Sequence, residues 1–249
     1  MSITKNYISG LVFAASFLVS TNVMSDVLSG KAVLSTSATV ISNELAKNVY
    51  ISPMRAENQT TGQSGFIVFC GDFNVSTSKS FSTTGENYGT FSLSSPSVTI
   101  YSDWQKSSIN DLFGHAYSQT FDSNNSILSS TYAQAFQLAL WSILHEETDN
   151  YDIMGGSFHL GSNYNSGVVN LTNSLLDAVL GNVSWDSIGL TEFTDYDLTV
   201  YVAAGGTHAS QTLLSVTGPP STVVPEPATL AVLGLGLVGL GIARRRMTK

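Results

Sequence analysis

The sequence predicts an α+β domain, in which an antiparallel, barrel-like β-sheet carries an inserted group of about three helices. Two observations support this fold class. Short β-branched and aromatic runs occur in both halves of the 249-residue chain, and residues 103–180 between them show helical periodicity. The two ends differ in composition from the rest, which leaves about 195 residues in the middle, the size of one domain.

In the first half, strands are predicted where apolar runs are bounded by turn residues. The clearest is Gly65–Cys70, a β-branched and aromatic run that lies between glycines. Further short strands are expected at 33–41, 49–51, 91–93 and 98–101.

Three helices are predicted next. Residues 103–120 place apolar side chains on one helical face. The segment Thr131–Leu144 begins with a Thr-x-x-Gln capping box and is apolar nearly all round, so we expect a buried helix. Residues 166–180 form the third helix, with Gly181 placed as its C-terminal cap.

Two strands complete the expected sheet. Residues 196–202 alternate between apolar and polar side chains, which is typical of a half-buried strand, and residues 211–216 form the last strand. The globular domain is therefore expected to span 26–218 and to be followed by a linker at 219–224.

The first 25 residues have the order of a secretory signal peptide. Lys5 supplies a positive charge, Ile8–Val19 is a short apolar stretch, and Val23–Ser25 offers the small or slim residues that a signal peptidase reads. Cleavage after Ser25 would leave Asp26 at the start of an exported protein.

Residues 225–249 have three parts. Pro225, Glu226 and Pro227 precede an uncharged apolar run at 228–243, which is followed by Arg244, Arg245 and Arg246. The apolar run is slightly shorter than the ~20 residues of a free-standing membrane span, and the arginines follow the positive-inside bias. This tail closely resembles the PEP-CTERM sorting signal of Gram-negative bacteria, which is recognised by an exosortase, a membrane cysteine transpeptidase that acts near the Pro-Glu-Pro.

The resemblance implies a transmembrane sorting helix that inserts transiently into the inner membrane. The protein would then reach the cell surface or the extracellular matrix, where adhesion or a place in a biofilm matrix is the expected role. An ordinary C-terminal membrane anchor is the alternative interpretation of the same residues.

Charge excludes one class of partner. Of the ten basic and eighteen acidic residues, the two terminal segments hold five and one, so the remainder carries 5 positive and 17 negative charges, a net of −12. A surface this acidic argues against nucleic acid as a partner.

Cys70, the single cysteine, lies at the end of a predicted strand, and Gln137 lies inside the most apolar helix. An uncharged amide in such a segment needs a reason, because burying it without hydrogen bonds costs about 1–3 kcal/mol. Here the chain resembles the thioester domains of bacterial surface adhesins, in which a Cys is covalently joined to a Gln that precedes a segment like x-Ala-Ile-Trp.

The resemblance implies a Cys70–Gln137 thioester that captures an amine on a partner surface protein or an exopolysaccharide, with no cofactor and no metal. Gln134 is the competing acyl donor. The alternatives are a buried structural Cys70 in a passive or exopolysaccharide-associated matrix protein, and a cysteine hydrolase with His115 or His145 as base. We expect no enzyme, and we interpret residues 122–126 as a turn rather than a calcium loop.

Overall fold

The computed structural model describes residues 25–42, 45–71, 80–146, 153–155, 158–161, 164–203 and 212–216. Apart from Ser25, the predicted signal peptide lies outside these residues, as do the predicted linker and the whole sorting tail, in which the transmembrane helix was expected. In the described part of the chain, no helix combines the length and hydropathy that a membrane span requires.

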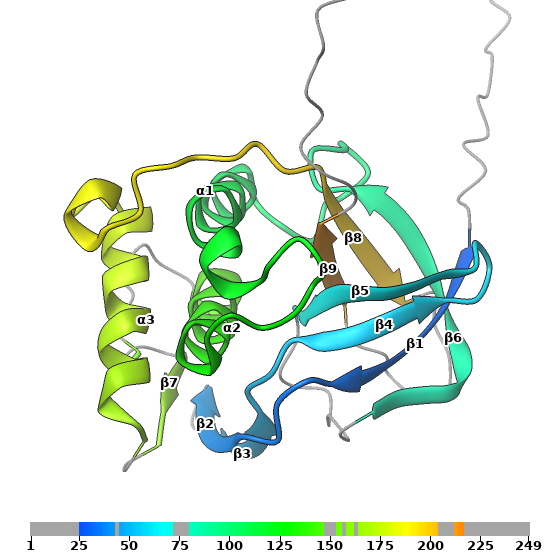
Figure 1. Cartoon of the computed structure of the whole chain (residues 1–249), viewed down its shortest axis with the longest axis horizontal. Coiled ribbons are helices and arrows are strands. Elements are labelled where there is room, and N and C mark those ends of the chain that lie inside the picture. The colour runs from blue at the N-terminus through cyan, green and yellow to red at the C-terminus, as the bar shows by residue number, and fades with distance from the viewer. Residues whose placement is uncertain are drawn as a thin grey trace, which may run out of the picture.

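A closed barrel of antiparallel strands forms one half of the molecule (Figure 1). Closure pairs each strand on both sides and leaves no open sheet edge. This architecture confirms the predicted barrel-like antiparallel sheet. The strands around the barrel are β1 (Ser25–Ala32), β4 (Met54–Asn58), β5 (Gln63–Cys70), β9 (Leu213–Val216), β8 (Leu198–Ala203) and β6 (Ser80–Ser92), and β6 pairs again with β1.

A smaller antiparallel sheet lies below the helices in Figure 1. Its order is β3 (Leu45–Tyr50), β2 (Ser37–Ser42) and β7 (Phe158–Leu160). The predicted strand at 33–41 therefore begins later than expected. Residues 33–36 leave the barrel and cross to this sheet, and the backbone N–H of Val33 donates to the Pro53 carbonyl on the way.

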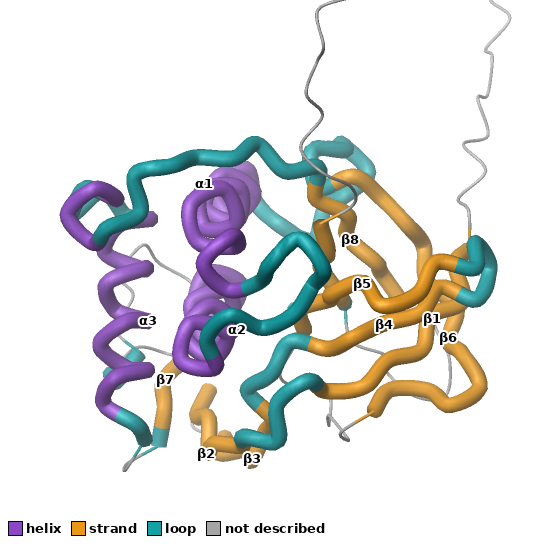
Figure 2. The backbone as a smooth tube through the Cα atoms, viewed as in Figure 1, coloured by secondary structure: helices purple, strands orange, loops and turns teal. Residues whose placement is uncertain are grey.

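The helices gather on one side of the barrel (Figure 2). They are α1 (Asp103–Thr120), α2 (Ser130–His145), α3 (Ser166–Val179) and the short 3-10 helix η1 (Trp185–Ile188). Helix α2 contacts α1, α3, β7 and β5, and every residue from 133 to 143 is buried. The three predicted helices and the central burial of the second are thus confirmed.

The strand predicted at 98–101 is wrong. These residues form turns, in which the Val98 N–H donates to the Ser95 carbonyl and the Thr99 N–H to the Ser97 carbonyl. Val98 is buried by packing against the core rather than by strand pairing. The segment leads directly into α1, whose capping box is formed by Ser102 and Gln105.

Two further local expectations are corrected. Helix α2 is capped by Ser129, whose side chain accepts from the Tyr132 N–H, and not by a capping box at Thr131. Strand β8 is buried on both faces from Leu198 to Tyr201, although its alternating sequence predicted one exposed face. Both faces are covered because the strand belongs to a closed barrel that also packs against other elements.

Candidate functional site: a buried cysteine and glutamine

Cys70 and Gln137 are brought together at the junction of barrel and helices. Cys70 is the last residue of β5, and Gln137 lies halfway along α2. Both are buried, with exposed fractions of 2% and 0%. The neighbouring rings of Phe69 and Phe136 pack with centroids 4.6 Å apart, which fixes the helix against the strand.

The Gln137 amide forms two hydrogen bonds with the backbone of Cys70. The Cys70 N–H donates to Gln137 Oε1 at 3.2 Å, and Gln137 Nε2 donates to the Cys70 carbonyl at 2.9 Å. Strand β4 cannot pair with these backbone groups. Its first residue, Met54, lies opposite Val68, so the β4–β5 ladder does not reach Cys70. The amide therefore takes the place of a strand residue, which explains how a polar side chain is accommodated in an apolar helix.

The surroundings of the thiol are apolar. Cys70 Sγ lies 3.6 Å from Met54 Sδ. On the opposite face of β5 the Phe69 ring contacts Phe113 and Phe121, and Trp141, four residues after Gln137 on α2, has no exposed surface. Bulk water is thus kept from the Cys70–Gln137 pair, and local interactions are strengthened in the low-dielectric interior.

Gly71 connects this pair to a histidine. Its N–H donates to the Thr212 carbonyl at 2.7 Å, and its own carbonyl lies 3.1 Å from His145 Nε2. A Cβ atom added at Gly71 would lie 2.9 Å from Tyr101 Oη and 3.1 Å from the Thr212 carbonyl oxygen. A residue without a side chain is therefore needed directly after Cys70.

The two histidines considered as bases lie in different surroundings. His145 Nε2 contacts the carbonyl of Gly71, the residue that follows Cys70. His115 instead stacks on Trp185 with ring centroids 4.4 Å apart, and its Nδ1 lies 3.1 Å from the Glu192 carbonyl. Sequence reasoning weighed both equally, because it could not show which one the fold brings to the end of β5.

The side chain of Gln134, the competing acyl donor, forms hydrogen bonds with residues other than Cys70. Its Oε1 accepts from the Tyr164 hydroxyl at 2.5 Å, and its Nε2 donates to the Ser130 carbonyl at 3.0 Å. It therefore packs α2 against the segment before α3, and within the described residues it does not bond to Cys70. The structure thus leaves Gln137 as the amide that contacts the cysteine.

Other predicted sites have simple outcomes. Asp122 Oδ1 accepts from the N–H groups of Asn124 and Ser126, each at 2.8 Å, so this segment is the expected turn. Among the residues that the structure describes, no group of three or more His, Cys, Asp or Glu side chains could hold a metal ion. The predicted sorting residues, Pro225, Glu226, Pro227 and Arg244–Arg246, lie outside the described residues.

Sequence reasoning missed the role of Met54 and the close approach at Gly71. The expected strand at 49–51 ends before Pro53 and no strand is expected at 54–58, whereas β4 begins directly after Pro53. The alternation Met54, Ala56, Asn58 was the available signal, since these three residues are buried and their neighbours are exposed.

Solved structures of bacterial proteins match this chain at low sequence identity. The N-terminal domain of the Streptococcus pyogenes pilus tip adhesin Cpa is 13% identical, with a TM-score of 0.43, and the match covers 68% of this chain and 84% of that one. The N-terminal thioester domain of fibronectin-binding protein SfbI from Streptococcus pyogenes is 13% identical, with a TM-score of 0.40 and coverage of 73% and 93%. The N-terminal thioester domain of a surface protein from Clostridium perfringens is 11% identical, with a TM-score of 0.41 and coverage of 73% and 99%.

Comparison with curated protein sequences finds no match. Residues 223–246 match the family model of the PEP-CTERM protein-sorting motif, which contains the predicted Pro-Glu-Pro, apolar run and arginines. The chain therefore carries a PEP-CTERM sorting motif, which marks it as an exported protein that an exosortase processes.

Proposed function

We propose that the exported domain is a covalent adhesin, in which Cys70 and Gln137 form an internal thioester. The observation that supports this most directly is the pairing of the two residues, since the Gln137 amide is held against the backbone of Cys70 by hydrogen bonds at both its oxygen and its nitrogen. Cys70 and Gln137 are also both buried, so attack of the thiol on the amide would face little competition from water.

The bond-forming step is balanced within the protein. Cys70 Sγ would attack the Gln137 Cδ, which forms a carbon–sulfur bond and breaks the carbon–nitrogen bond of the amide. The thiol proton leaves with the amide nitrogen as ammonia. No oxidant or cofactor is needed, because the oxidation state of both groups is unchanged.

The backbone favours this step. The Cys70 N–H, 3.2 Å from Gln137 Oε1, would donate to that oxygen as it gains negative charge in the tetrahedral intermediate. Such a donor is effective because it is already oriented and lies in a site from which bulk water is excluded. Of the two histidines considered, His145 is the one whose ring contacts the residue after Cys70, through Nε2 and the Gly71 carbonyl.

In the second step, an amine on a partner surface attacks the same carbon, forms an amide with Gln137 and returns the Cys70 thiol. The partner would be an amine-bearing surface protein or exopolysaccharide. The reaction consumes the bond once, so we propose an attachment protein rather than an enzyme. Export by the sorting motif would place the thioester outside the cell, at the surface or in the matrix.

One observation favours a second function. Both polar groups of the Gln137 amide already have a hydrogen-bond partner. Completing the β5 ladder would therefore be enough to explain why this residue is present. The protein would then be a passive structural or exopolysaccharide-associated component of the extracellular matrix, without covalent chemistry.

The intact mass of the purified exported protein separates the two functions. A thioester makes the protein one ammonia lighter than its processed sequence and protects Cys70 from alkylation. Methylamine should restore the thiol and add its own mass at Gln137. Cys70→Ala and Gln137→Ala should each abolish the mass deficit and the methylamine adduct.

Gln134→Ala is the matched control, because Gln134 is a second buried glutamine of the same helix with hydrogen bonds of its own. This variant should keep the mass deficit. A wild-type protein that has its full processed mass and gains no mass from methylamine would contradict the covalent function. The passive matrix role would then remain.

A further inference from the structure

A cavity lies at the C-terminal end of α1, and neither Cys70 nor Gln137 lines it. It measures about 610 Å³. Its walls come from β5, from the C-terminal turn of α1 and the loop after it, from the segment before β8, and from the last residue of β9. The lining residues are Gln63, Phe66, Tyr117, Ser118, Phe121, Asp122, Ser123, Asn125, Tyr196 and Val216.

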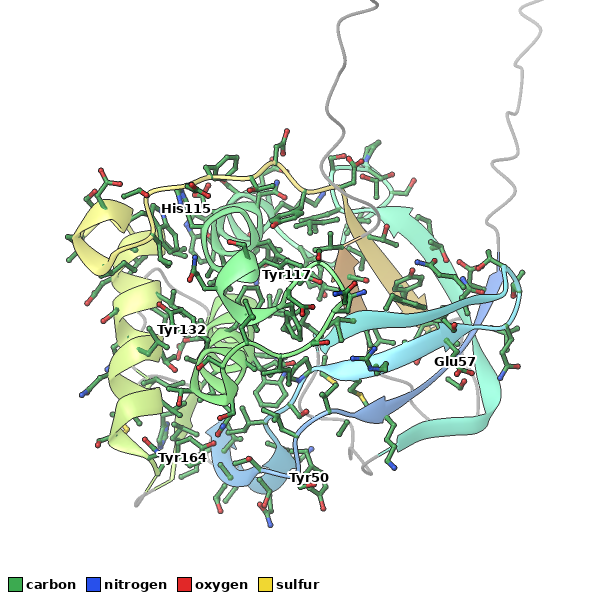
Figure 3. The ribbon with its side chains drawn as sticks, in the orientation of Figure 1. Tyr50, Glu57, His115, Tyr117, Tyr132 and Tyr164 are labelled. Atoms are coloured by element: carbon green, nitrogen blue, oxygen red, sulfur yellow. The ribbon has the colours of Figure 1, made fainter. Side chains whose placement is uncertain are left out.

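Aromatic rings form the inner wall of this cavity. Tyr117 lies between α1 and the barrel (Figure 3) and is nearly buried. Its ring centroid lies 5.3 Å from that of Phe121 and 5.2 Å from that of Tyr196. Tyr196 is only half-buried, so part of its ring remains available to a bound molecule.

The rim is formed by polar groups that keep hydrogen-bonding capacity for a ligand. Ser118, Ser123 and Gln63 are exposed, and the Gln63 side chain makes no hydrogen bond to the described residues. The hydrogen bonds that Asp122 accepts end on Oδ1, so Oδ2 keeps its capacity to accept. No lysine, arginine or histidine is among the lining residues, which disfavours an anionic ligand.

The rim is held in place before any ligand binds. Asn125 adopts a left-handed backbone conformation with φ of 58°, which is uncommon outside glycine. Its carbonyl accepts from Arg55 Nη2 at 2.8 Å, its Nδ2 donates to the Gly65 carbonyl at 3.4 Å, and its Oδ1 accepts from the Tyr117 hydroxyl at 3.4 Å. These contacts fasten the loop to β4 and β5, which lowers the ordering cost of binding.

The electrostatic state of Tyr117 suits a hydrogen-bonding site. Burial, together with the neighbouring Tyr196, raises the pKa of Tyr117 well above its usual value of 10. Its hydroxyl therefore stays neutral at physiological pH and keeps its proton for donation to Asn125.

We propose that this cavity binds a neutral saccharide. The apolar C–H face of a sugar ring packs against an aromatic ring, as Tyr196 offers, while its hydroxyl groups both donate and accept. Carboxylate, amide and hydroxyl groups at the rim supply matching acceptors and donors from Asp122, Gln63 and Ser118. A cavity of this size and mixed lining is also within the range of small-ligand sites.

A cationic amine is the main competing ligand, since tyrosines and a carboxylate also recognise ammonium groups. Such recognition is strongest where several open aromatic faces surround the charge, as in aromatic cages. Here Phe66, Tyr117 and Phe121 are 5%, 8% and 3% exposed, so Tyr196 alone offers a substantial open face. The rim hydrogen-bonding groups outnumber the open rings, which favours a polyhydroxylated ligand.

The test is binding of neutral sugars to the purified protein by ligand-observed NMR and calorimetry. Glucose, galactose, N-acetylglucosamine and their linear oligomers serve as probes at millimolar concentration. At least one should bind, and Tyr196→Ala should weaken it about tenfold or more, because the stacking surface is removed. Tighter binding of an oligomer than of its monomer would indicate a polysaccharide chain, and equal binding a single sugar unit.

Ser118→Trp should block the cavity from its exposed rim and abolish binding. Gln119→Trp is its matched control, since Gln119 is the next residue of α1, is exposed and does not line the cavity. Phe193→Ala serves the same purpose for Tyr196, as an exposed aromatic of the same connecting segment outside the cavity.

Three results would overturn the proposal. One is the absence of binding for every sugar probe. The second is binding that Tyr196→Ala and Ser118→Trp leave unchanged. The third is binding of choline or N-methylated lysine, but of no sugar, to the wild-type cavity. Because neither Cys70 nor Gln137 lines the cavity or is substituted in these measurements, their outcome can be separated from thioester formation.

Discussion

Replacing Cys70 with alanine should distinguish a cross-linked domain from one held only by hydrogen bonds. A thioester would join residues 67 positions apart. By the chain-entropy relation used for disulfides, closing a loop of this length restricts the unfolded chain by about 4 kcal/mol. Removal of a buried sulfur alone costs about 1 kcal/mol. Cys70→Ala should therefore lower the free energy of unfolding by about 5 kcal/mol if the bond exists.

The assay is urea unfolding followed by tryptophan fluorescence. Loss of the cross-link should also raise the m-value, because an open unfolded chain exposes more surface than a closed one. Methylamine treatment of the wild-type protein should reproduce most of both changes without any substitution. Gln137→Ala should cost more than Cys70→Ala, since it also leaves the buried Cys70 N–H without its Gln137 Oε1 partner, at about 1–3 kcal/mol.

The reasoning would be refuted by a Cys70→Ala protein that loses only about 1 kcal/mol with an unchanged m-value, together with a wild type that is insensitive to methylamine. In that case Gln137→Ala would still destabilise the fold through its two hydrogen bonds. The comparison of the two variants therefore separates the chemical role of the pair from its structural one.

Three further outcomes are expected. Trp141→Ala should cost about 3–5 kcal/mol in urea unfolding, because the ring is fully buried between α2 and its neighbours; a cost below about 1 kcal/mol would contradict the central position of the helix. Glu226→Ala should leave a longer, membrane-bound form in cell fractions, whereas identical fractionation of variant and wild type would contradict processing at the Pro-Glu-Pro. Burial raises the pKa of Tyr164 and Tyr201 from 10 to about 12, so the neutral phenols favour the folded state. The free energy of unfolding should be unchanged below pH 10 and fall as the pH rises toward 12. A free energy of unfolding that is constant across this window would contradict the burial of these hydroxyls.

The sequence by itself determined the features that depend on near neighbours in the chain. Helical periodicity placed α1, α2 and α3 within a residue or two of their bounds, because apolar spacing and Gly181 at a positive φ act over a few residues. The sorting motif was equally local, since its three parts are contiguous. The single cysteine and the glutamine inside an apolar helical segment could likewise be identified from residue type and position in the chain.

Tertiary structure decided what depends on residues far apart in the chain. Strand β8 is buried on both faces because the barrel closes, which its own alternating residues do not reveal. Residues 98–101 have strand composition but pair with no strand in the described part of the chain, so they form turns. The contact between Cys70 and Gln137 and the cavity at Tyr117 both join segments that only the closed fold brings together, because side-chain hydrogen bonds and cavities require proximity in space rather than in sequence.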